Sequence, residues 1–140
     1  MGPLARRVGD LRRLEVAHWD YEGNPATGEL VVHADHVDDL TAVFATLFDA
    51  EFPIQSMRLI TDFDSDDDAS MAANNSSAFN CREISGRPGV WSQHSYGGAV
   101  DLNPLVNPWV RGSLVDPPDG APYVDRDQDV PGLILSLIHI

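Results

Sequence analysis

One long amphipathic segment, residues 35–52, limits most strongly how this chain can fold. Its apolar side chains recur at the three- and four-residue spacing of one helix face, and they are Val37, Leu40, Val43, Phe44, Leu47 and Phe48. Asp35 is a suitable N-cap, and Asp38 and Asp39 would lie in the first turn, where the helix dipole favours anions. Pro53 would end the helix. The segment therefore predicts one main helix.

Short segments of strand-like composition surround this helix. They are Gly28–Ala34, Ile54–Phe63, Phe79–Ile84 and Gly98–Asn103. Gly86–Gly89 is typical of a turn, and Pro104–Pro131, which holds six of the ten prolines, is typical of a loop. The pattern predicts an α+β fold in which one main helix packs on a small antiparallel sheet, with long loops around a cleft.

Length and charge exclude several classes of protein. A chain of 140 residues, 43% of them hydrophobic, is long enough for one domain with its own core. The net charge of −13 argues against general nucleic-acid binding and against docking on anionic lipid, because both need a basic face. No apolar run approaches the roughly 20 residues that span a bilayer. The single cysteine, Cys81, excludes an internal disulfide, and we interpret it as a buried, small apolar residue.

Two charged segments need separate interpretation. The first thirteen residues hold four of the nine arginines and predict a mobile basic arm. The acidic segment Asp62–Asp68 fails the EF-hand calcium pattern, because Asp67 and Ala73 stand where that motif needs Gly and Glu. It is either a solvated acidic loop or a loop in which Asp67 or Asp68 meets a substrate ammonium at the rim of the cleft.

The segment Trp91–Pro104 carries the clearest chemistry. Gly97 and Gly98 permit a tight turn after His94. In a strand that follows this turn, one face would point to the core with Val100 and Leu102, and the other to the cleft with Ala99, Asp101 and Asn103. His94 and Asp101 could then converge, and an imidazole with a carboxylate suits a zinc ion that keeps one position open for water. Taken alone, a His and an Asp at this spacing are more often a chance pair.

The whole string from Ser92 to Pro104 resembles the signature of the M15 family of zinc peptidases. This family includes D-alanyl-D-alanine carboxypeptidases, dipeptidases of the vancomycin-resistance type and phage L-alanyl-D-glutamate endolysins. The resemblance runs from about Leu30 to about Ile134, with further similar blocks at Phe52–Arg58, Asp66–Arg82 and Asn103–Pro108. It implies the fold of the hedgehog and D-Ala-D-Ala peptidase type.

The resemblance also assigns roles to individual residues. His94 and Asp101 match two of three zinc ligands, and Arg82 matches the arginine that faces the scissile carbonyl. Ser92 matches the serine beside the first ligand, a contact to the substrate or to the ligand itself. The implied reaction is hydrolysis of peptidoglycan stem peptides containing D-amino acids, by a zinc-activated water and a carboxylate base. The resemblance implies a location outside the cytoplasmic membrane, although the chain shows no signal peptide.

The chain departs from the family near its C-terminus. The third zinc ligand and the general base belong to an Asp-x-x-His or Glu-x-x-His string, whereas His139 has Ser136 three residues before it. Residues 135–140, Leu-Ser-Leu-Ile-His-Ile, match the translation of a common sequencing adapter, so we expect a truncated copy with doubtful activity. The expected organisation is an N-terminal arm and lead-in segment (1–27), an incomplete peptidase core (28–134) and a non-native tail (135–140).

Two other interpretations stay open. The chain could be a non-catalytic module that binds cell-wall peptides through the cleft and Arg82, without a metal. It could also be a folded remnant that binds neither peptide nor zinc. Trp91 and Tyr96 would either line the cleft or pack in the core.

Overall fold

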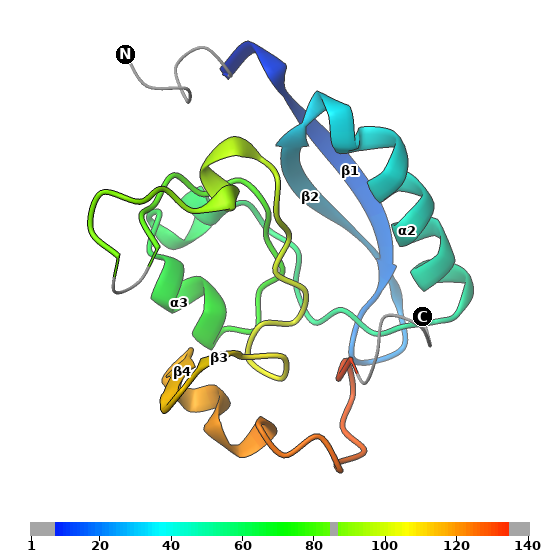
Figure 1. Cartoon of the computed structure of the whole chain (residues 1–140). Helices are drawn as coiled ribbons and strands as arrows, with labels where there is room; N and C mark the ends of the chain where they lie inside the picture. Colours follow the sequence, from blue (N-terminus) through cyan, green and yellow to red (C-terminus); the bar gives the residue numbers. More distant parts are fainter. Residues whose placement is uncertain (1–7, 85–86, 135–140) are drawn as a thin grey trace.

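The computed structural model describes residues 8–84 and 87–134, and in them two small antiparallel sheets accompany one main helix (Figure 1). The larger sheet pairs β1 (Leu11–Trp19) with β2 (Pro25–His33), and the smaller pairs β3 (Trp109–Arg111) with β4 (Leu114–Asp116). The main helix is α2 (Val37–Asp49), and α3 (Asp67–Ala72) is short. The described part of the chain also holds five short 3-10 turns: η1 (Val8–Asp10), η2 (Ala34–His36), η3 (Ile60–Phe63), η4 (Gln93–Tyr96) and η5 (Pro118–Tyr123).

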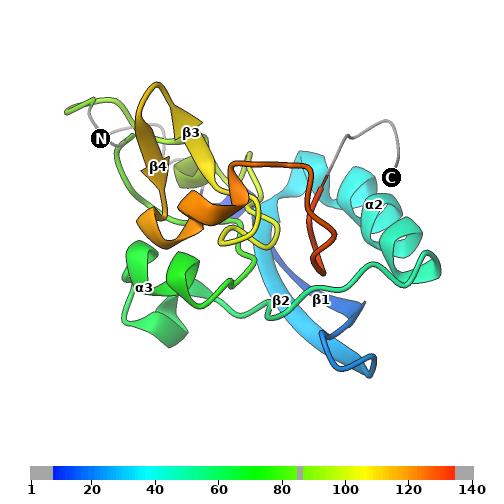
Figure 2. The ribbon, with the colours of Figure 1, turned by 90° about the horizontal axis from the view of Figure 1, so that it is seen from below.

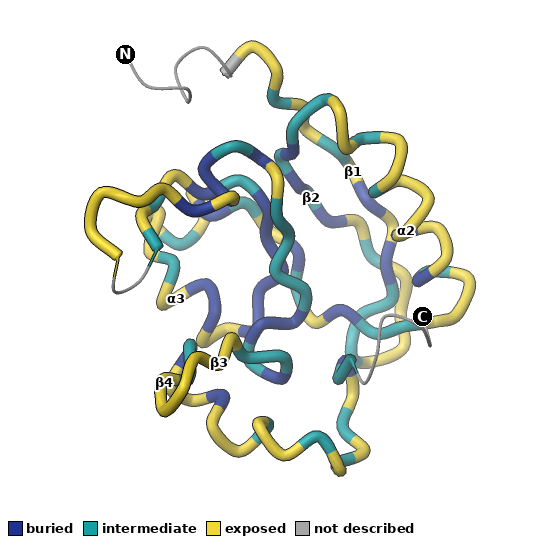
Figure 3. Tube along the Cα trace, viewed as in Figure 1, coloured by how far each residue is buried: buried dark blue, intermediate teal, exposed yellow. Residues whose placement is uncertain are grey.

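The core lies between the β1–β2 sheet, α2 and the central loops. Strand alternation brings Val16, Leu30 and Val32 to one face of the sheet, and Phe44 and Leu47 of α2 pack against them. Helix α2 packs mainly on β1, while α3 and the β3–β4 hairpin lie on the opposite side of β2 (Figures 1 and 2). Figure 3 shows the buried residues along β2 and the neighbouring loops, with β3 exposed. The prediction of an α+β arrangement, with one main helix on a small antiparallel sheet, is confirmed.

The main helix starts later and ends earlier than predicted. Asp35 is not its N-cap: it lies in η2, where the His33 side chain accepts a hydrogen bond from the Asp35 N–H. Helix α2 then begins at Val37, with Asp38 and Asp39 in its first turn as predicted. It ends at Asp49, before Pro53, because Glu51 adopts a positive φ of 56° that turns the chain.

Three of the predicted strands do not form. The segments Ile54–Phe63, Phe79–Ile84 and Gly98–Asn103 contain isolated bridges, and part of the first is the 3-10 turn η3. Conversely, Pro104–Pro131 is more ordered than a loop, since it holds β3, β4 and η5. The prediction of a mobile arm is wrong from Val8 onward, because η1 and β1 occupy that part. Residues 1–7 and the predicted tail 135–140, including His139, lie outside the described residues.

Buried asparagine side chains explain why the segment after Pro53 is extended without a strand partner. The Asn75 amide accepts from Arg58 N–H (2.9 Å) and donates to Arg58 C=O (2.9 Å), as the backbone of a neighbouring strand would. The Asn103 amide acts in the same way, accepting from Gln55 N–H (3.2 Å) and donating to Pro53 C=O (2.9 Å). These side chains satisfy the buried backbone in place of a ladder.

Candidate active site

A pocket of about 470 Å³ lies between η4, α3 and the β3–β4 hairpin. Four of the predicted site residues line it, namely Arg82, Ser92, His94 and Asp101. The other lining side chains are Met71, Ile84, Gln93, Ala99, Pro104, Asn107, Pro108, Trp109 and Asp116. The structure therefore brings the central predicted residues together in one hollow.

The turn η4 fixes the position of His94. The Ser92 hydroxyl oxygen accepts the His94 N–H (3.2 Å) and caps the turn. Gly97 ends the turn in the left-handed region, with a φ of 69°, and a Cβ there would lie 2.5 Å from the His33 nitrogen. Only glycine fits this position without strain, which confirms the predicted tight turn after His94.

His94 and Asp101 form a closely held pair. The His94 side chain is buried, its Nδ1 lies 2.6 Å from the Ala78 carbonyl oxygen, and its Nε2 lies 3.3 Å from Asp101 Oδ1. Asp101 is held by an antiparallel bridge in which its N–H donates to Ser77 (2.8 Å) and its C=O accepts from Ser77 (3.0 Å). Burial lowers the pKa of the His94 imidazole, but the hydrogen bond and charge of Asp101 outweigh burial, so this pKa is raised.

The spacing of this pair fits two ligands of one zinc ion. Donor atoms about 2.0–2.2 Å from a tetrahedral zinc lie about 3.4 Å apart, close to the observed 3.3 Å. When Nδ1–H donates to Ala78, the Nε2 lone pair of His94 is free to bind a metal. Within residues 8–84 and 87–134, however, no group of three or more His, Cys, Asp and Glu side chains is arranged to hold a metal. The described residues thus fit two positions of a zinc site and supply no third ligand.

Arg82 extends the charged cluster on the other side of Asp101. Its Nη2 lies 3.9 Å from Asp101 Oδ2, and its Nε lies 3.3 Å from Asp67 Oδ2. The contact between Arg82 and Asp67 is an ion pair only. Arg82 Nε is buried and makes no hydrogen bond of acceptable geometry. Asn80 donates to Asp67 (2.9 Å), and the Ser95 hydroxyl joins the Arg82 backbone to η4. A guanidinium is therefore fixed at the pocket beside the His94–Asp101 pair.

The acidic residues around the pocket differ in position from the prediction. Neither Asp67 nor Asp68 is among the lining residues: Asp67 is half-buried behind Arg82, and Asp68 is exposed. Burial raises the pKa of Asp67, and Arg82 opposes this shift. Sequence reasoning missed Asp116, which lines the pocket from β4 and whose pKa is raised by burial and by the charge of Asp68. Its only signal was an acidic residue before two prolines in a segment interpreted as loop.

Residues next to the site pair differ in part from the positions predicted for them. Asn103 does not face the cleft: a positive φ of 44° breaks the alternation, and its buried side chain binds Pro53 and Gln55. Cys81 is exposed, so its interpretation as a buried apolar residue is wrong. Neither Trp91 nor Tyr96 is among the lining residues, whereas Ala99 is, as predicted.

Comparison with known families agrees with this site. Residues 85–135 match the family of M15 peptidases described as D-alanyl-D-alanine carboxypeptidase. The match covers just over a third of the chain and contains Ser92, His94 and Asp101, whereas Arg82 and Asp67 precede it. No curated protein and no solved structure matches the chain. The relationship to M15 peptidases is thus shown for residues 85–135.

Among the described residues, no helix combines the length and the apolar character that crossing a membrane needs.

Proposed function

We propose that this chain is the core of an M15-type zinc peptidase that hydrolyses peptidoglycan stem peptides containing D-amino acids, outside the cytoplasmic membrane. The observation that carries the proposal is the His94–Asp101 pair, whose side chains lie 3.3 Å apart in one pocket and whose residues both belong to the range matched by the family. The mixed α/β arrangement is compatible with a fold of the hedgehog and D-Ala-D-Ala peptidase type.

The chain's own residues would divide the work as follows. His94 and Asp101 would hold the zinc, which in such peptidases acidifies a bound water and polarises a carbonyl. Arg82, fixed by Asp67, supplies positive charge where a peptide carbonyl oxygen would become negative. Ser92 keeps the His94 ring in place through the backbone of η4. Asp68 and Asp116 add negative charge near the pocket, which favours a substrate ammonium over a carboxylate there.

The described residues lack one part that efficient hydrolysis needs. They offer two zinc ligands where catalytic zinc sites use three. We therefore expect weak zinc binding and negligible turnover from residues 8–134 alone.

A non-catalytic module that binds cell-wall peptides is the second candidate. One observation favours it: Asp67, Arg82, Asp101 and His94 form a continuous chain of charged contacts beside the pocket. Such a cluster can bind the charged ends of a peptide without chemistry. This function needs the pocket and Arg82 but does not need zinc.

Zinc and peptide titrations of matched variants distinguish the two candidates. Calorimetry would follow zinc and a stem pentapeptide ending in D-Ala-D-Ala, and mass spectrometry would detect cleavage. For the peptidase core, His94→Ala and Asp101→Asn abolish zinc binding, and Arg82→Gln weakens peptide binding, while exposed Arg87→Gln changes neither. Zinc binding that survives both ligand variants contradicts the peptidase proposal. Peptide binding that is independent of zinc and of His94, but lost in Arg82→Gln, establishes the binding module.

A further inference from the structure

Within residues 8–84 and 87–134, one edge of strand β1 has no strand partner along most of its length. Its other edge pairs with β2 over the whole strand, from Leu11↔His33 to Trp19↔Pro25. On the open edge, the Trp19 carbonyl accepts the Ile54 N–H (2.8 Å), which closes the C-terminal end. A two-stranded sheet with an open edge offers a ready template for another strand.

The backbone hydrogen bonds of β2 show which backbone N–H and C=O groups of β1 point to the open edge. Three β2 residues bond through their backbone to segments on the side away from β1, and they are Glu29, Val31 and His33. Because N–H and C=O of a strand residue point the same way and neighbours alternate, the even-numbered β2 residues bond to β1. Their partners are Arg12, Leu14, Val16 and His18. The backbone groups of Arg13, Glu15 and Ala17 therefore face outward, with no backbone partner among the described residues.

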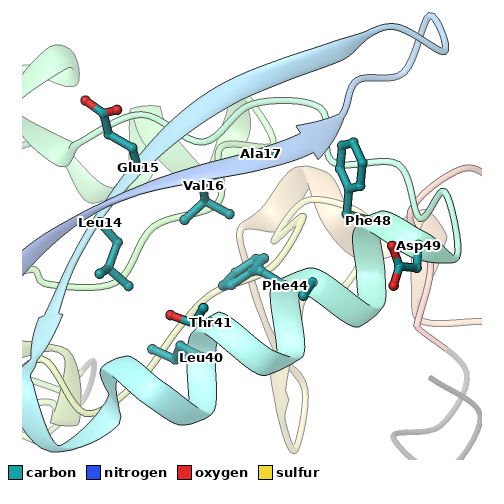
Figure 4. A pocket seen from close by; sticks show the side chains of 10 residues that line it. Leu14, Glu15, Val16, Ala17, Leu40, Thr41, Phe44, Phe48 and Asp49 are labelled. Atoms are coloured by element: carbon teal, nitrogen blue, oxygen red, sulfur yellow. The ribbon is translucent and has the colours of Figure 1, made fainter.

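A largely apolar groove of about 310 Å³ runs beside this edge, between β1 and α2 (Figure 4). Figure 4 shows Leu14 and Val16 pointing from β1 toward α2, whereas Glu15 points to the other face of the sheet. Helix α2 contributes Leu40, Thr41, Phe44, Ala45, Phe48 and, at its C-terminal end, Asp49 to the groove. A strand added to the edge would cover this groove with its inward side chains.

We propose that β1 of a second copy of this chain occupies the edge, antiparallel and centred on Leu14. In this register Arg13 lies opposite Glu15 of the second copy, and Glu15 lies opposite its Arg13. Both are outward-facing residues, so the pairs exchange backbone hydrogen bonds. The two Leu14 side chains meet at the two-fold axis on the groove side. The result is a four-stranded sheet across two copies, an isologous interface.

The charges of Arg13 and Glu15 favour a second copy of the chain at the β1 edge, and they favour the register centred on Leu14. Glu15 and Glu29 lie directly opposite each other in the β1–β2 pair, which is unfavourable for like charges. Arg13 relieves this by binding both, at 3.2 Å and 3.0 Å. A second copy brings a second guanidinium directly opposite Glu15. Centring the pair on Arg13 or on Glu15 would instead place like charges opposite each other. Charged side chains normally discourage edge pairing, but here their order makes the edge complementary to itself.

A charge-exchange experiment tests the proposal on the full chain. Sedimentation velocity from about 10 µM to about 1 mM should show a monomer–dimer equilibrium for the wild type. Arg13→Glu places Glu opposite Glu twice, and Glu15→Arg places Arg opposite Arg twice. Each variant alone should therefore raise the dissociation constant roughly tenfold or more. An equimolar mixture of the two variants should form heterodimers, because both cross-strand pairs are then Glu with Arg.

The control is Arg111→Glu, which makes the same charge change on the exposed β3–β4 hairpin and should leave self-association unchanged. Circular dichroism and thermal unfolding confirm that each variant is folded. A wild type that stays monomeric to about 1 mM overturns the proposal, as does a dimer that both single variants retain. A mixture that fails to associate rejects the Leu14-centred register.

Hydrogen exchange locates the interface independently of charge. The amides of Arg13, Glu15 and Ala17 should gain protection as protein concentration rises, whereas those of Leu14 and Val16 are protected at every concentration by β2. Protection of the outward amides that does not depend on concentration would assign the edge to another segment of the same chain and contradict the proposal.

Discussion

His94 Nε2 and Asp101 Oδ1 lie 3.3 Å apart although seven residues separate them, and both are held by backbone groups of one segment. Ala78 accepts from the His94 ring, and Ser77 bridges the Asp101 backbone. The segment 77–78 therefore aligns both side chains of the candidate site.

The turn after His94 depends on one glycine. In Gly97→Ala the new Cβ would lie 2.5 Å from the His33 nitrogen, in addition to the strain of a φ of 69°. We expect a loss of about 3 kcal/mol or more in unfolding free energy, measured by urea titration. Gly89→Ala is the control: its φ is similarly positive at 80°, but a Cβ there has open space and should cost only about 1 kcal/mol. Equal losses would contradict the packing argument.

The Ser92 hydroxyl should matter for both stability and ligand geometry. In Ser92→Ala the His94 N–H loses its cap, which costs about 1 kcal/mol in unfolding free energy. Because the cap fixes η4, zinc affinity should also fall, by roughly tenfold. Exposed Ser113→Ala serves as control in the same calorimetric and unfolding measurements. A zinc affinity unchanged in Ser92→Ala would show that the cap does not position His94.

Asn75 should be among the most sensitive residues outside the pocket. It is fully buried and bonds Ser56, Ser70 and both backbone groups of Arg58. Asn75→Ala leaves those buried groups without partners, so we expect a loss of about 3 kcal/mol in unfolding free energy. Exposed Asn24→Ala should change this free energy by less than about 0.5 kcal/mol. Loss of less than about 1 kcal/mol at Asn75 would mean that water replaces the amide.

Asp116 gives a prediction about pH. Its folded-state pKa is raised by burial and by Asp68, so the contribution of this carboxyl to stability is present at low pH and is lost as pH rises through the folded pKa. Asp116→Asn should therefore melt at a higher temperature than wild type at pH 7, and the difference should shrink toward pH 4. The control Asp119→Asn, an exposed residue in η5, should show no such trend. A difference in melting temperature that grows on acidification would refute the assignment.

The elements that depend on neighbouring residues alone could be predicted from the sequence. Helix α2 follows from its apolar periodicity, most of strand β2 follows from the strand-like composition of Gly28–Ala34, and the turn at Gly97 follows from the two glycines. The segment Ile54–Phe63 was wrongly predicted to be a strand, because its composition suits one. Its backbone instead forms hydrogen bonds with the side chains of Asn75 and Asn103. No periodicity reveals partners that lie about 20 and 50 residues further along the chain.

The candidate site could be predicted only for residues that lie in the segments resembling the family. Ser92, His94 and Asp101 were named because the string from Ser92 to Pro104 resembles a family signature, and Arg82 because it ends a similar block upstream; all four line one pocket. Asp116 and Trp109 could not be found, because only the β3–β4 hairpin brings them to that pocket. Asn103 was misplaced because its positive φ breaks the alternation on which the prediction relied.

The central claim is that His94 and Asp101 are zinc ligands, and nitrogen-15 NMR of the His94 ring tests it most directly. On addition of zinc, we predict that the Nε2 resonance shifts to the metal-bound range while the Nδ1–H bonded to Ala78 is retained, and that Asp101→Asn abolishes this response. His94 ring resonances that stay unchanged at millimolar zinc, or that respond equally in Asp101→Asn, would contradict the account.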